Sequence, residues 1–184
     1  VICALVSLLW FALGYSLAFG SGSAWLGDTS AAWLQTLRFD KVHAQLSVHP
    51  LAPSVPEPVF LMFQLSFAII TPALIVGAFA ERIRFAALLW FIALWSLAVY
   101  APVAHWVWAP EGWLNALGAL DFAGGTVVHI NAGVAGLVAA WMVGKRLGHG
   151  SVPLMPANLG YTAIGAGLLW VGWMGRSEEH TSEL

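Results

Sequence analysis

Charged residues are scarce in this sequence. Lys, Arg, Asp and Glu together make up 9% of the 184 residues, whereas a soluble domain carries about 25%. Hydrophobic residues make up 60%, and the mean hydropathy is +0.81. The net charge of −2 offers no electrostatic footprint for nucleic acid, so no nucleic-acid partner is expected. This composition predicts an integral membrane protein whose surroundings are the lipid bilayer.

Cysteine is limited to Cys3, which lies in an apolar run. A single thiol excludes an intrachain disulfide, and we expect no metal and no cofactor. The apolar start has no basic region and no small-residue cleavage site, so we do not interpret it as a signal peptide. Because the first residue is Val1 rather than Met, we expect that the chain was cut from a longer one.

Long apolar runs are abundant, and each is long enough to approach the roughly 20 residues of a transmembrane helix. Five such runs are residues 1–19, 59–80, 86–108, 122–144 and 157–175. They are continuous rather than alternating, which argues against a transmembrane β-barrel. The predicted fold class is an all-α, polytopic helical bundle.

The only long connection, residues 20–58, opens with Gly and Ser and closes on four prolines. We therefore predict an irregular, exposed loop, with His43 and His49 solvated. Short loops with Arg82, Arg84 and residues 145–146 carry the basic residues, so the positive-inside rule places them in the cytoplasm. The loops 20–58 and 109–121 then face outward, and the expected location is the cell (inner or plasma) membrane.

Five side chains are candidates for a transport site. His129 lies within an uncharged apolar run with Asp121 at its mouth, and ionisable groups at membrane depth by default mark a pathway for solute. Phe63 and Phe67 are one helical turn apart and should share a face. Trp108 should lie near the same outer end, and its ring can attract an ammonium-type cation.

Each candidate also has a structural interpretation. Asp121 can cap a helix, the two phenylalanines can pack in the core, and Trp108 can belong to an interfacial aromatic belt. His129 can make a single structural hydrogen bond. His105 can likewise be a hydrogen-bonded residue at the interface. An intramembrane enzyme is not expected, because no nucleophile or second carboxylate accompanies Asp121 and His129.

The segments around these candidates resemble the ammonium transporter family (Amt/MEP/Rh). The resemblance covers residues 1–175. It is carried by residues 63–67 (FQLSF), 77–85 (GAFAERIRF), 104–108 (AHWVW) and 118–133 (GALDFAGGTVVHINAG). It implies about five transmembrane helices of an eleven-helix fold, within a homotrimer with one pore in each subunit. A PII-type regulatory protein at the cytoplasmic face is a further implied partner.

The resemblance also implies roles for individual residues. Trp108, supported by Asp121, would recruit ammonium at the outer face, Phe63 would line the vestibule and Phe67 would gate the pore. His129 would be the first of two pore histidines that pass ammonia. The alternative is an ammonium-sensing receptor of the same fold. Residues 176–184 change composition abruptly and resemble a translated sequencing adapter, so we expect this tail to be non-native.

Overall fold

The computed structural model describes residues 1–41, 44–153 and 155–174. It divides into two units, residues 1–144 and 145–184, and each is considered by itself. The α-helices of the first unit are α1 (Ile2–Leu9), α2 (Tyr15–Phe19), α3 (Glu57–Val76), α4 (Phe85–Trp95), α5 (Ala101–Trp108), α6 (Trp113–Ala116) and α7 (Asn131–Val143). The described part of the second unit contains α8 (Leu159–Met174). The predicted tail, 176–184, lies outside the described residues.

Three π-helical segments join these helices. They are η1 (Trp10–Gly14), η3 (Ser96–Tyr100) and η4 (Gly125–Ile130). Each continues a helix, so that Ile2–Phe19, Phe85–Ala116 and Gly125–Val143 are long enough to cross a membrane, as is Glu57–Val76. Within the described ranges, α8 is a shorter apolar helix. The predicted helical membrane fold is confirmed, and all five predicted runs are helical.

The predicted boundaries differ most from the observed ones at the end of the second run and at the end of the third. The run 59–80 is helical from Glu57 to Val76 and then turns, with Gly77 as its C-cap residue. The run predicted as 86–108 corresponds to a helical stretch from Phe85 to Ala116. It is longer because the chain turns after Trp108 and then forms the short helix α6. Both differences concern helix ends, where a hydropathy pattern carries little information.

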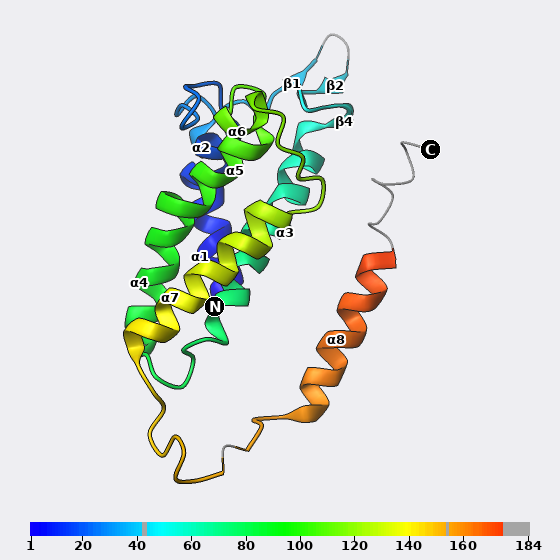
Figure 1. Cartoon of the computed structure of the whole chain (residues 1–184). Helices are drawn as coiled ribbons and strands as arrows, with labels where there is room; N and C mark the ends of the chain where they lie inside the picture. The colour runs from blue at the N-terminus through cyan, green and yellow to red at the C-terminus, as the bar shows by residue number, and fades with distance from the viewer. Residues whose placement is uncertain (42–43, 154, 175–184) are drawn as a thin grey trace. The chain divides into compact units, whose positions relative to one another are not determined.

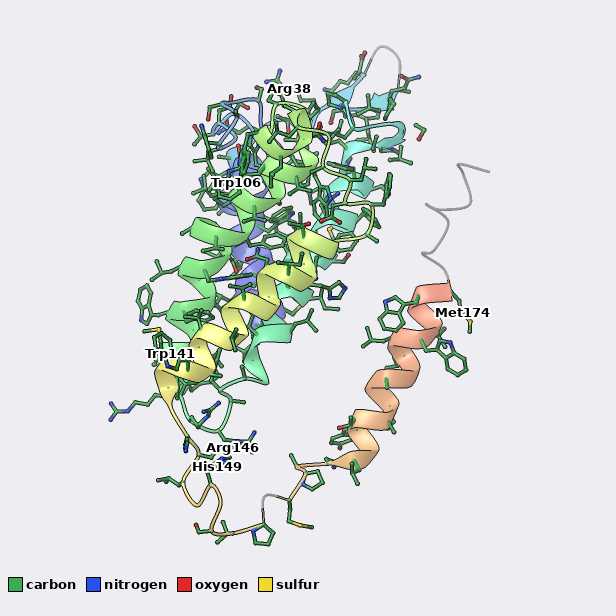
Figure 2. All side chains as sticks on the ribbon, viewed as in Figure 1. Arg38, Trp106, Trp141, Arg146, His149 and Met174 are labelled. Atoms are coloured by element: carbon green, nitrogen blue, oxygen red, sulfur yellow. The ribbon has the colours of Figure 1, made fainter. Side chains whose placement is uncertain are left out.

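The first unit is a bundle, and the described part of the loop 20–58 lies with α6 at one end of it (Figure 1). Arg38 and Trp106 lie toward this end, and Trp141 lies toward the opposite one (Figure 2). Helices α3 and α7 pack closely because α7 presents small residues. A Cβ added to Gly136 would lie 3.6 Å from the Cβ of Ala78, an ordinary contact distance. Gly136 of α7 therefore lies close to the turn that follows α3, as small residues allow at membrane-helix contacts.

Arg82 joins two chain segments that follow helices. Its guanidinium donates hydrogen bonds to the carbonyl oxygens of Gly144 and Ala78, at the ends of α7 and α3. A positive side chain at two helix C-termini also complements their dipoles. Arg82 therefore has a structural role in addition to its positive charge, because it links the ends of α7 and α3.

The prediction of an irregular loop is wrong for residues 39–41 and 44–56. Their strands pair as two short antiparallel two-stranded sheets (Figure 1). Their strands are β1 (Phe39–Asp40), β2 (Gln45–Leu46), β3 (Val48–His49) and β4 (Ala52–Pro56). The prolines do not prevent pairing, because each ribbon has only two strands and every strand is therefore an edge strand. Upstream, η2 (Ala32–Leu34) is a single 3-10 turn.

The prediction that His49 is solvated is also wrong. Its imidazole stacks on the Phe60 ring at a centroid distance of 4.5 Å and meets Phe19 edge-on at 6.0 Å. Its Nε2 lies 3.3 Å from the Phe19 carbonyl oxygen, and its Nδ1 accepts a hydrogen bond from the Leu51 amide at 3.2 Å. Aromatic packing thus holds β3 against the helix ends. His43 lies outside the described residues.

Candidate functional site

Helix α3 presents Phe63 and Phe67 on one face. Their rings meet edge-to-face with centroids 5.0 Å apart, which confirms that they share a face. Phe67 is half-buried, whereas Phe63 is 55% exposed. The pair is therefore not a fully packed core contact, and the Phe63 ring remains open on one side.

Phe67 also contacts Trp108, the last residue of α5. The two ring centroids lie 5.7 Å apart at an interplanar angle of 61°. The indole Nε1 of Trp108 donates a hydrogen bond to the backbone oxygen of Asp121 at 2.7 Å. Two contacts thus orient Trp108, one from α3 and one from the segment that precedes η4.

Asp121 caps η4 with both carboxylate oxygens. Oδ1 accepts hydrogen bonds from the amides of Gly124 and Gly125 at 2.6 and 2.8 Å. Oδ2 accepts from those of Thr126 and Val127 at 2.8 and 2.9 Å. Gly124 permits this turn with a φ of 85°, a left-handed conformation that glycine adopts readily. The carboxylate therefore faces the amides at the start of η4, and it fixes the backbone of this turn by hydrogen bonds.

His129 lies on η4, the segment that Asp121 caps. Its side chain is exposed, and its ring is not among the aromatic contacts formed by the described residues. The structure therefore connects Phe63, Phe67, Trp108 and Asp121 directly. It relates His129 to them only through the backbone of η4.

His105, on α5, is fully buried, with 0% of its surface exposed. Its Nδ1 lies 3.0 Å from the carbonyl oxygen of Ala18, and its Nε2 lies 2.8 Å from that of Ser23. The ring therefore holds the end of α2 and the following loop against α5. The hydrogen-bonded interpretation of His105 is confirmed, although the residue is buried rather than interfacial.

Replacing His105 by phenylalanine should release the loop that begins at Gly20. The imidazole N–H could no longer donate to the carbonyl oxygen of Ala18 or of Ser23, and an unsatisfied buried carbonyl group costs about 1–3 kcal/mol. We expect faster protease cleavage or amide exchange in residues 20–27 of the complete protein. The matched control is His149→Phe, at an exposed position. Equal protection in both variants would contradict this role of His105.

Sequence reasoning missed a buried carboxylate at the start of α3. Glu57 is only 4% exposed, and it accepts a hydrogen bond from the Tyr15 hydroxyl at 3.1 Å. The available signal was an acidic residue directly before a long apolar run. In the part of the chain that the structure describes, no group of three His, Cys, Asp or Glu side chains is placed to hold a metal ion.

Comparison with known proteins decides the family. A model described as "Ammonium Transporter Family" matches residues 1–176, nearly the whole sequence. The chain belongs to the ammonium transporter family. An ammonium transporter of Bacillus subtilis is 48% identical over 172 residues, which cover 94% of this chain and 40% of that transporter. The chain thus spans about two fifths of the length of such relatives.

Solved structures of family members have the same fold. Mep2 of Candida albicans matches with a TM-score of 0.79 and 36% identity over 95% of this chain and 38% of that structure. A structure described as "Sensor Amt Protein" matches with a TM-score of 0.78 and 31% identity, over 95% of this chain and 43% of that one. This ammonium transporter family member is therefore a multi-pass membrane protein with a polytopic helical fold.

Proposed function

We propose that the complete protein carries ammonium or ammonia across the cell (inner or plasma) membrane, and that this chain lines the outer part of the conduit. The observation that carries the proposal is the continuous contact from Phe63 through Phe67 to Trp108. The indole of Trp108 is in turn held by the segment that carries Asp121. Aromatic rings arranged in this way form a surface for a small cation at the outer end.

Each residue of the proposed conduit is chemically suited to one step of ammonium transport. The Trp108 ring attracts an ammonium ion through its quadrupole by about 0.5–2 kcal/mol. The Phe63 and Phe67 rings form an apolar constriction that excludes hydrated ions. Beyond it, a neutral His129 imidazole can both accept and donate a hydrogen bond, so it can pass ammonia and relay a proton. Asp121 positions both Trp108 and η4 by holding the turn between them.

The remainder of the protein should complete this conduit. Apolar side chains are left exposed around the site, including Phe63 at 55% and Ile130 at 60%. We propose that residues 1–175 are one part of a transmembrane domain whose other helices cover these side chains, within a homotrimer. A PII-type regulatory protein is proposed as a partner of the cytoplasmic face, which carries Arg82 and Arg84.

Uptake by cells that lack their own ammonium transporters tests the function. Cells that produce the complete protein should take up ammonium. Trp108→Leu should raise the half-saturating concentration roughly 2- to 30-fold, because the cation–π attraction is lost. Trp90→Leu is the matched control, since Trp90 is 70% exposed on α4. Binding of ammonium without any uptake would contradict transport and favour the sensor, and equal effects of both variants would contradict the role of Trp108.

A further inference from the structure

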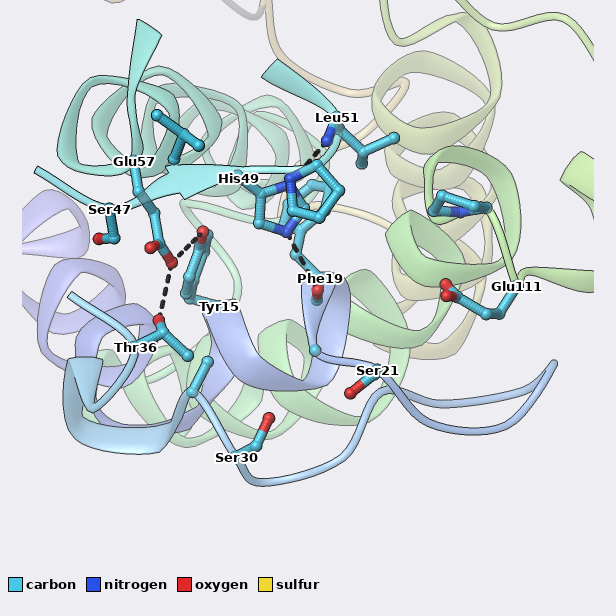
Figure 3. Close-up of a pocket in the computed structure, with 15 residues that line it drawn as sticks. Tyr15, Phe19, Ser21, Ser30, Thr36, Ser47, His49, Leu51, Glu57 and Glu111 are labelled. Atoms are coloured by element: carbon cyan, nitrogen blue, oxygen red, sulfur yellow. Dashed lines mark hydrogen bonds between the residues drawn. The ribbon is translucent and has the colours of Figure 1, made fainter. Parts of the chain in front are cut away.

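A cavity in the first unit is lined by none of the five residues of the proposed conduit. It has a volume of about 350 Å³ and lies between the ends of α2 and α3, the hairpin β3–β4 and the start of the loop after α5 (Figure 3). The residues that matter for its chemistry are Tyr15, Phe19, Thr36, His49, Glu57 and Glu111.

The carboxylate of Glu57 is buried beside this cavity with only neutral partners. Its Oε1 accepts hydrogen bonds from the Tyr15 hydroxyl at 3.1 Å and from the Thr36 hydroxyl at 2.7 Å. Its other oxygen, Oε2, receives no hydrogen bond from the described residues (Figure 3). The side chain is only 4% exposed, so water does little to stabilise its charge.

The cavity supplies no positive charge to balance Glu57. No Lys or Arg is among the described residues that line it, whereas Glu111 adds a second carboxylate. Both ring nitrogens of His49 are directed at backbone groups, Nδ1 at the Leu51 amide and Nε2 at the Phe19 carbonyl oxygen, and not at Glu57. A buried charge without an opposite partner is unfavourable. A cation in the cavity would remove that cost.

The remaining walls favour an organic cation over a bare ion. The rings of Tyr15, Phe19 and His49 line the cavity, and Val48, Pro50 and Leu51 add apolar surface. Aromatic rings attract cations and also bury a hydrocarbon body. We propose that this cavity binds a small organic ammonium cation, with its positively charged head on Glu57 Oε2 and its apolar body against the aromatic wall. The site would act separately from the conduit at Trp108.

Calorimetric titration of the complete protein in lipid nanodiscs tests this site, with benzylammonium as the probe. Binding should weaken at least roughly tenfold in Glu57→Gln, because the amide keeps the shape of the carboxylate but loses its charge. Uncharged benzyl alcohol should bind the wild-type protein at least roughly tenfold more weakly than benzylammonium for the same reason. Glu81→Gln, at the opposite end of the bundle, is the matched control and should bind as the wild type does.

A cavity-filling variant keeps the test decisive if Glu57→Gln fails to fold. Val48→Trp enlarges a side chain that lines the cavity and is 54% exposed. The valine side chain has no polar atom, so the substitution removes no hydrogen bond from Glu57. It should abolish benzylammonium binding. Equal affinity of benzylammonium and benzyl alcohol, or unchanged binding in Val48→Trp, would overturn the proposal. Loss of binding in Trp108→Leu but not in Glu57→Gln would assign the probe to the conduit and also overturn it. None of these results depends on ammonium flux.

Discussion

Replacing His129 by alanine in the complete protein is expected to lower ammonium uptake by about a hundredfold. The imidazole is the one group on η4 that can exchange a proton with a passing amine, and such positioned proton transfer typically contributes at least about 10²-fold. His129 is exposed and carries no structural hydrogen bond among the described contacts, so its removal should leave the fold intact. Initial uptake rates of labelled methylammonium or ammonium, at matched protein levels, give the measurement.

The control for this prediction is His149→Ala, an exposed histidine in the second unit. It should transport as the wild type does. A His129→Ala variant that folds and still transports ammonium at the wild-type rate, with unchanged proton coupling, would contradict the role of His129. Reduced uptake that coincides with lost protein would instead indicate a structural residue.

Asp121→Ala is expected to lower uptake by a different route. The substitution removes four hydrogen bonds to the first amides of η4, and the loss of a helix cap alone costs about 0.5–2 kcal/mol. The backbone oxygen of Asp121 also accepts the hydrogen bond from the Trp108 indole. When the turn loses its cap, both Trp108 and His129 should therefore move out of position. Thermal unfolding in detergent should begin at a lower temperature, and uptake should fall at least roughly tenfold in step with it.

The conservative variant separates capping from charge. Asp121→Asn retains one oxygen acceptor, so it should recover part of the thermal stability and part of the uptake. Asp28→Ala is a suitable control, because Asp28 also caps a turn by accepting from Ser30, but at an exposed position. If Asp121→Ala kept full thermal stability while it lost uptake, the carboxylate would act on the cation directly and the capping account would be wrong.

The sequence alone predicted the features that depend on local patterns. Run lengths located the helices, because a membrane span needs about 20 apolar residues whatever its neighbours are. The four-residue spacing of Phe63 and Phe67 predicted their shared face. The position of Asp121, just before a helix, predicted that its carboxylate could cap that helix.

Features that depend on distant contacts were not predictable in this way. His105 is held by carbonyl groups 82 and 87 residues away in sequence, and no local pattern encodes that burial. His49 lies in a polar, proline-rich loop, yet aromatic rings from α2 and α3 pack against it and leave it only half-buried. Glu57 is a charged residue at the end of a loop, where exposure is expected. It is buried instead, and the hydroxyl groups of Tyr15 and Thr36 donate hydrogen bonds to its carboxylate.

The central claim is that Phe67, Trp108 and His129 line one enclosed passage for an amine. A structure of the complete protein, determined with bound methylammonium, tests it most directly. The account predicts density for the amine against the Trp108 ring, outside Phe67, with the His129 imidazole inside the same closed channel. An imidazole that faces the lipid acyl chains, or that protein side chains separate from Phe67 and Trp108, would contradict the account.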